Sequence, residues 1–420
     1  MSSQSDDLQK RRAQRMAQKN QLKKQKRKLI FRFSLAGGVL LLGIVLVLFL
    51  TKPDRIDTPP SPQESISSQP DAQSPNTVIH LAAAGDLNIN DAVVAAGGMD
   101  LDYTDAFMDV GSILAHADIS VLNFEGNLCG APYGSASLSA PQALVQALRN
   151  VGVDALQLAN SYPINQGMSG LSATINAVQA AGLEPLGAYG SNAALQEGKG
   201  YSIREVNGVR IAFVAFTKGM NGMRLPAGNE GFVNVLYTDY DSTYQTIDTD
   251  GITRILSSVQ ESKPDLTVAL LHWGSEFNNT VSDSQKSIVK LLRDNGVNAI
   301  IGTHSHYVQK MEYDSQSGDF LAYSLGDFFG DAQRAGSEYS VILDLEITKN
   351  NRSGDTKITN FSYTPIFTVN EKDKPLRIVR IHEAMLSYEQ GYINRVSPQT
   401  YEAMKYALER IEARISGENE

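Results

Sequence analysis

The chain has 420 residues, 42% of them hydrophobic and 20% charged, which is long enough for one large α/β domain with additional segments. Its formal net charge of −9 is unevenly distributed, because residues 1–32 hold 11 basic and 2 acidic residues and the rest hold 26 basic and 44 acidic ones. A domain this acidic lacks the basic face that binds phosphate backbones, which argues against nucleic acid as a partner. The single cysteine, Cys129, excludes an intrachain disulfide.

The N-terminal region carries the one continuous uncharged hydrophobic run, residues 33–50. As a helix this run would span about 27 Å, close to the hydrocarbon core of a bilayer, and the basic flank before it places the N-terminus in the cytoplasm. A cleaved signal peptide is the alternative, disfavoured by the long basic region and the missing small-residue cleavage site. We predict a basic cytoplasmic tail (1–32), a single-pass transmembrane anchor (33–51), a disordered Pro/Ser-rich linker (52–77) and an extracellular C-terminal domain.

From residue 78 onward, short apolar runs alternate with helical patterns. We expect strands at 78–84, 119–124, 154–159, 201–206, 209–216, 266–271 and 297–301, and helices at 104–116, 141–150, 167–181, 250–262 and 284–295. Later strands are expected at 308–313, 320–325, 339–347 and 357–365, before a final helix at 398–416. The alternation predicts an α/β fold, and the late strands suggest a second sheet packed on the first. The main domain is placed at 78–370, with a C-terminal extension ending in a helix at 371–420.

Histidines directly follow two of the predicted strands. The segment Gly-Thr-His-Ser-His at 302–306 follows one apolar run, and His272 follows another. Neutral imidazole is the commonest protein ligand for divalent transition metals. His304 and His306 are one residue apart, so both can reach a metal only if the backbone between them is irregular.

Carboxylates and an amide follow three other predicted strands, and ligands bind at the carboxyl ends of strands in α/β sheets. Mixed oxygen and nitrogen ligands suit Zn, Mn or Fe(II), and two ions can share a bridging carboxylate. Each residue alone also has an ordinary interpretation, such as a turn cap, a surface ion pair or a packed aromatic neighbour. Their joint occurrence predicts a site for one or two divalent ions, with the ligands Asp86, Glu125, Asn160, His272, His304 and His306.

The order of these motifs resembles the poly-gamma-glutamate capsule synthesis proteins, the CapA-like family of the calcineurin-like metallophosphatase superfamily. The resemblance covers about residues 78–330 and implies a metallophosphatase-like sandwich of two packed mixed β-sheets flanked by helices, on a membrane-anchored protein that faces outward. It rests on Gly-Asp at 85–86, Asn-Phe-Glu at 123–125, Ala-Asn at 159–160, His-Trp-Gly-Ser-Glu at 272–276, Gly-Thr-His-Ser-His at 302–306 and Ser-Leu-Gly at 324–326.

Two positions depart from the family pattern. The family continues Ala-Asn as Asn-Asn-His, whereas this chain has Ser161 and Tyr162 after Asn160. The resemblance implies that the missing histidine stabilises or protonates a leaving group, and tyrosine, with an ordinary pKa of about 10, is a slow acid at neutral pH. Asp327 stands where the family has asparagine and adds a carboxylate near the site, and Asn88 is a further candidate ligand.

The combined prediction is a membrane-anchored extracytoplasmic protein of the capsule-synthesis type, acting in assembly, export or trimming of an anionic surface polymer. Its expected partners are that polymer or its synthesis and export subunits. If the protein is active, it would be a metal-dependent hydrolase with Tyr162, His272 and Glu276 as catalytic residues. Two alternatives stay open: a metal-dependent phosphoesterase, and a non-catalytic scaffold or binding domain in which Tyr162 has replaced the acid.

Overall fold

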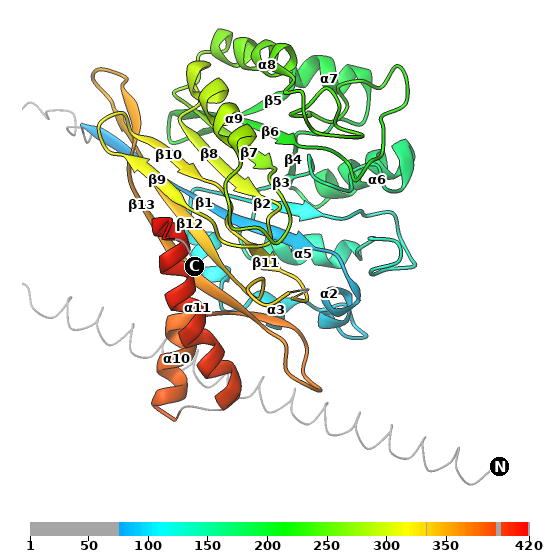
Figure 1. Cartoon of the computed structure of the whole chain (residues 1–420), viewed down its shortest axis with the longest axis vertical. Coiled ribbons are helices and arrows are strands. Elements are labelled where there is room, and N and C mark those ends of the chain that lie inside the picture. The colour runs from blue at the N-terminus through cyan, green and yellow to red at the C-terminus, as the bar shows by residue number, and fades with distance from the viewer. Residues whose placement is uncertain (1–74, 333, 392–395, 419–420) are drawn as a thin grey trace, which may run out of the picture. The chain divides into compact units, whose positions relative to one another are not determined.

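The computed structural model describes residues 75–332, 334–391 and 396–418 (Figure 1). The predicted tail, anchor and nearly all of the linker lie outside these residues. Within the described part of the chain, no helix is both long and apolar enough to cross a membrane.

The larger of two mixed sheets has eight strands, in the order β14-β13-β12-β1-β2-β3-β4, with β11 beside β1. The pairs β1–β2, β2–β3, β3–β4 and β1–β11 are parallel. The pairs β1–β12, β12–β13 and β13–β14 are antiparallel. The strands are β1 Asn76–Asn88, β2 Ile119–Glu125, β3 Ala155–Gln157, β4 Glu184–Leu186, β11 Asp327–Phe329, β12 Tyr339–Asn350, β13 Thr356–Val369 and β14 Arg377–Arg380.

The smaller sheet has six strands in the order β5-β6-β7-β8-β10-β9, with a parallel centre and antiparallel edges. They are β5 Tyr201–Val206, β6 Val209–Thr217, β7 Leu266–His272, β8 Ala299–Thr303, β9 Met311–Asp314 and β10 Asp319–Ala322. The described helices are α2 Asp91–Ala96, α3 Thr104–Phe107, α4 Gly111–His116, α5 Gln142–Asn150, α6 Gly167–Ala180, α7 Asn192–Gly198, α8 Thr249–Glu261, α9 Asp283–Asp294, α10 Ile381–Glu389 and α11 Pro398–Ser416.

Alternate residues of the central strands enter two different cores, which explains their nearly continuous apolar sequences. In β7, Val268 and Leu270 belong to the core shared with the larger sheet, whereas Ala269 and Leu271 pack with residues of α8 and α9. Figure 1 shows α8 and α9 beside the smaller sheet. The predicted α/β fold of two mixed sheets flanked by helices is therefore confirmed.

The expected separation of early and late strands was wrong. Strands β12 to β14 join the larger sheet through β1, and β9 and β10 join the smaller one, so both sheets mix early and late strands. The single strand expected at 320–325 ends at Ala322, because the chain then crosses from the smaller sheet to the larger one and starts β11 at Asp327.

Two further expectations change in detail. The helix expected at 104–116 is divided into α3 and α4, and Gly111, a poor helix former, begins the second piece. Beyond residue 370, β14 pairs with β13, and Met404, Ala407 and Ile411 of α11 are buried in the main core. The segment predicted as a C-terminal extension thus contacts the larger sheet, and the boundary at residue 371 stays a prediction.

Two glycines let the crossing segment 323–326 pass between the two sheets. A Cβ atom on Gly85 of β1 would lie 1.7 Å from the Gly326 carbonyl oxygen, and one on Gly302 of β8 would lie 2.0 Å from that of Tyr323. The close approach allows the Asp86 N–H to donate to the Gly326 carbonyl at 3.0 Å and the Leu325 N–H to donate to that of Gly302 at 3.1 Å.

We expect Gly85→Ala to lower the free energy of unfolding by about 1–3 kcal/mol or more, because the clash is with backbone that cannot rotate away. Urea unfolding of the full chain in detergent measures this change. Gly190→Ala is the matched control, since its Cβ would meet nothing closer than 3.7 Å. Equal stability of the two variants would contradict the close approach at Gly85.

Candidate metal centre

The two sheets contribute different chemistry to one cluster. The larger sheet supplies carboxylates: Asp86 of β1 lies opposite Asp327 of β11, and Glu125 ends β2. The smaller sheet supplies imidazoles, because His272 ends β7 and the segment with His304 and His306 follows β8. All six side chains are buried.

The first group consists of Glu125, His272 and His304, each offering one ligand atom within 4.8 Å of the others. The His272 Nε2 atom lies 3.2 Å from Glu125 Oε1 and 2.9 Å from the Ser161 hydroxyl. The ring centroids of His272 and His304 are 4.4 Å apart. A carboxylate and two imidazoles of this kind form a donor set for a transition metal.

The second group consists of Asp86, His306 and Asp327, again within 4.8 Å of one another. His306 Nδ1 lies 2.8 Å from Asp327 Oδ1. Asp86 accepts a hydrogen bond from the Asn123 amide at 2.6 Å and another from the His304 backbone N–H at 2.9 Å. Asp86 therefore connects the two groups.

The backbone between the two histidines is irregular, as their spacing requires. His304 has φ 88° and His306 has φ 60°, a region that residues with a Cβ rarely adopt. Because of this double left-handed conformation, His304 joins the first group and His306 the second. Such strain persists only where the surroundings hold it, and it concentrates at functional sites.

The charges of the cluster are strongly coupled. Burial raises the pKa of Asp86 to about 6, and the charge of Glu125 adds to the rise. Burial also opposes ionisation of Glu125, but the charge and hydrogen bond of His272 outweigh it and lower the Glu125 pKa. For His306, burial acts to lower the pKa, yet the ion pair with Asp327 outweighs it and raises the pKa to about 10.

His304 is the best evidence that these residues fit a metal ion. Burial, followed by the charges of His272 and Lys218, lowers the pKa of His304 well below its ordinary value, so its ring is neutral. Both of its ring nitrogens, and Glu125 Oε2, are buried without a hydrogen-bond partner among the described residues. Such orphaned polar atoms are costly, and a cation accepting their lone pairs would satisfy them.

The structure brings the predicted ligands together, with one difference at Asn160. The Asn160 amide donates to the carbonyl of Phe124 at 2.6 Å, and its oxygen accepts from the Tyr162 N–H at 3.0 Å. Its place as a ligand stays a prediction, as do the other ligand assignments. Of the predicted catalytic residues, His272 is in the first group, Tyr162 is half-buried beside it and Glu276 is exposed.

Several residues of the cluster were not assigned from the sequence. Thr303 lies 3.1 Å from His272 Nδ1, and Ser161 approaches its other nitrogen. Asp327, noted only as a departure from a motif, is a full member of the second group and is hydrogen-bonded by Asn88. The added carboxylate after Ser-Leu-Gly was the sequence signal for it.

Among solved structures, the chain is similar to a calcineurin-like phosphoesterase from Bacillus subtilis, with 14% identity, a TM-score of 0.43, and coverage of 80% of this chain and 100% of that one. It is also similar to a 5′-nucleotidase from Candida albicans, with 12% identity, a TM-score of 0.41, and coverage of 80% and 57%.

Two curated proteins match the folded region. The capsule biosynthesis protein CapA of Bacillus anthracis is 29% identical over 217 residues, which is 51% of this chain and 49% of that protein. The PGA biosynthesis protein CapA of Bacillus subtilis is 26% identical over 231 residues, 53% of each chain. The chain thus spans about half the length of these relatives.

A family model described as bacterial capsule synthesis protein PGA_cap matches residues 80–332. The match takes in both groups of the candidate metal centre and the crossing segment between the sheets. Because it covers more than half of the chain, the protein belongs to the PGA_cap family of bacterial capsule synthesis proteins.

Proposed function

We propose that this protein is a membrane-anchored, extracytoplasmic capsule-synthesis protein that acts on an anionic surface polymer, in its assembly, export or trimming, through a site for one or two divalent ions. The family membership supports the capsule part of the proposal. The apolar run at 33–50 supports the anchor.

One observation carries the metal part: two carboxylate–imidazole groups lie side by side, and one imidazole has both nitrogens buried without a partner. Glu125, His272 and His304 would hold one ion, and Asp86, His306 and Asp327 a second. A bound ion would act as a Lewis acid toward the substrate and activate water for attack.

The chain's own residues then fix geometry and protons. Asn123 and the His304 N–H orient the Asp86 carboxylate, and Asp327 orients His306. Burial, helped by the charges of Glu125 and Glu276, raises the pKa of Tyr162 to about 12. Tyr162 therefore keeps its proton at neutral pH and can donate a hydrogen bond, but it is a poor general acid.

We expect near-stoichiometric Zn, Mn or Fe in the purified full chain and a loss of about half or more of it in His304→Ala. Removing a ligand should cost more than the roughly 10–100-fold in affinity that is lost with an outer-shell partner. Elemental analysis after metal supplementation and desalting measures it. His382→Ala, at an exposed histidine in α10, is the matched control and should keep its metal. Wild-type protein without metal would contradict the proposal.

Asp327→Asn restores the residue usual in the family and removes one charge. Because Asp327 is a proposed ligand, we expect the change to weaken binding of the second ion by at least the roughly 10–100-fold that an outer-shell partner contributes, measured by competition with a chelator. Asp344→Asn is the control, because Asp344 pairs with His80 in the same way but away from the centre. Unchanged metal affinity in Asp327→Asn would leave Asp327 only a structural partner of His306.

The scaffold alternative is favoured by Tyr162, and a leaving-group comparison tests it. Nitrophenolate departs without a proton, whereas an alkoxide needs an acid. We therefore expect Tyr162→His to raise hydrolysis of an alkyl phosphate by roughly 10²-fold or more, with little change for p-nitrophenyl phosphate. His304→Ala should abolish both activities. Failure of wild type and Tyr162→His to hydrolyse either ester would favour the scaffold.

A further inference from the structure

Arg334 lies next to the candidate metal centre through an aromatic stack. Its guanidinium carbon is 4.5 Å from the centroid of the Phe277 ring, and the Phe277 ring stacks on His306 at 4.7 Å with an interplanar angle of 20°. Phe277 is half-buried and Arg334 is exposed. The stack therefore runs from His306 of the second group, through Phe277, to Arg334 at the surface.

The backbone around Arg334 is held in place. The Arg334 carbonyl accepts hydrogen bonds from the Ser337 N–H at 3.1 Å and from the Ser337 hydroxyl at 2.9 Å. The Tyr307 hydroxyl donates to the next carbonyl, that of Ala335, at 3.1 Å. The Tyr307 hydrogen bond links the loop of Arg334 to the loop that carries His306. The position of Arg334 relative to the centre is therefore held by this bond as well as by the contact with Phe277.

The Arg334 guanidinium has no hydrogen bond or ion pair with any other described residue. In contrast, Lys218, whose charge acts on His304, donates from Nζ to the Gly274 carbonyl at 2.8 Å, and its burial lowers its pKa. Lys218 is therefore used to hold the loop after β7. The Arg334 guanidinium lies over the Phe277 ring. Its N–H groups remain available to donate two hydrogen bonds to one carboxylate or phosphate.

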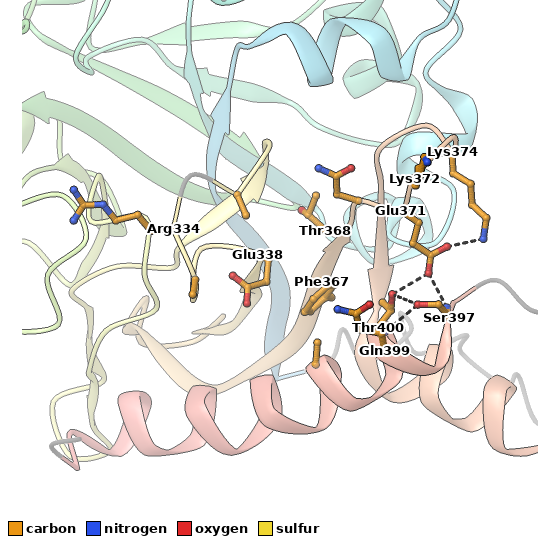
Figure 2. A pocket seen from close by; sticks show the side chains of 14 residues that line it. Arg334, Glu338, Phe367, Thr368, Glu371, Lys372, Lys374, Ser397, Gln399 and Thr400 are labelled. Atoms are coloured by element: carbon orange, nitrogen blue, oxygen red, sulfur yellow. Dashed lines mark hydrogen bonds and ion pairs between the residues drawn. The ribbon is translucent and has the colours of Figure 1, made fainter.

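A cavity begins at Arg334 and extends away from the centre. It has a volume of about 740 Å³, in the range of ligand sites, and is bounded by the loop after β11, the β13–β14 turn and the start of α11. Figure 2 shows Arg334 extending away from Lys372 and Lys374, which lie on the far side. The Glu371 carboxylate is engaged by Lys374, Ser397 and Thr400. The guanidinium of Arg334 points away from these residues, so the cavity adjoins Arg334 on the side opposite its N–H groups.

We propose that Arg334 binds an oxyanion of the substrate, a carboxylate or a phosphate, as that substrate reaches the metal centre, and so sets specificity for an anionic ligand. The inference rests on the proposed metal-dependent function. It also explains how a domain with a large acidic excess can accept an anionic ligand. The metal ions that the centre would hold, together with Arg334, would offset the local negative charge.

Isothermal titration of inorganic phosphate and of glutarate into the metal-loaded full chain tests the inference. We expect wild type to bind at least one probe, and Arg334→Ala to weaken that binding by at least about tenfold with unchanged metal content. Arg334→Lys keeps the charge without the planar fork and should lie between them. The probe that binds more tightly identifies the anion as phosphate or carboxylate.

Arg352→Ala, at an exposed arginine in the β12–β13 turn, is the matched control and should bind like wild type. The inference is overturned if wild type binds neither probe, if Arg334→Ala retains full affinity, or if Arg352→Ala loses as much. Metal-loaded protein with unchanged affinity in Arg334→Ala refutes the role of Arg334 alone. Wild type without metal refutes the proposed function and this inference with it.

Discussion

Polar contacts between the two sheets hold the cluster together, and the central one is a hydrogen bond from the backbone N–H of His304, after the smaller sheet, to the carboxylate of Asp86 in the larger one at 2.9 Å. His304 makes this bond from a left-handed backbone conformation, next to the place where segment 323–326 passes closely over Gly85 and Gly302. Carboxylates from one sheet and imidazoles from the other are thereby brought within ligand distance. The candidate metal centre therefore lies between the two sheets.

This cluster is electrostatically unfavourable without a cation. Three buried carboxylates lie in this cluster, and desolvation, followed by the charge of Glu125, raises the pKa of Asp86 to about 6. His306 offsets part of the charge through its ion pair with Asp327, but neutral His304 offsets none. Buried charges are normally paired or coordinated to metals, so an added cation is the simplest way to balance the cluster.

The sequence placed candidate residues at strand ends, and within each sheet the carboxyl ends of parallel strands do converge. Asp86, Glu125, His272, His304 and His306 were all located this way. The path of the chain after Ala322 could not be predicted, since a switch between sheets depends on the close approach at Gly85 and Gly302 rather than on local pattern. Asp327 was consequently recognised as unusual but not placed, and the late strands were assigned to the wrong sheets.

Anomalous X-ray diffraction from crystals of the full chain grown with Mn²⁺ tests the central claim most directly. Anomalous peaks are expected within coordination distance of the two groups, one beside Glu125, His272 and His304 and one beside Asp86, His306 and Asp327. The absence of a peak at both groups, with the side chains in the same arrangement, would contradict a metal centre between the two sheets.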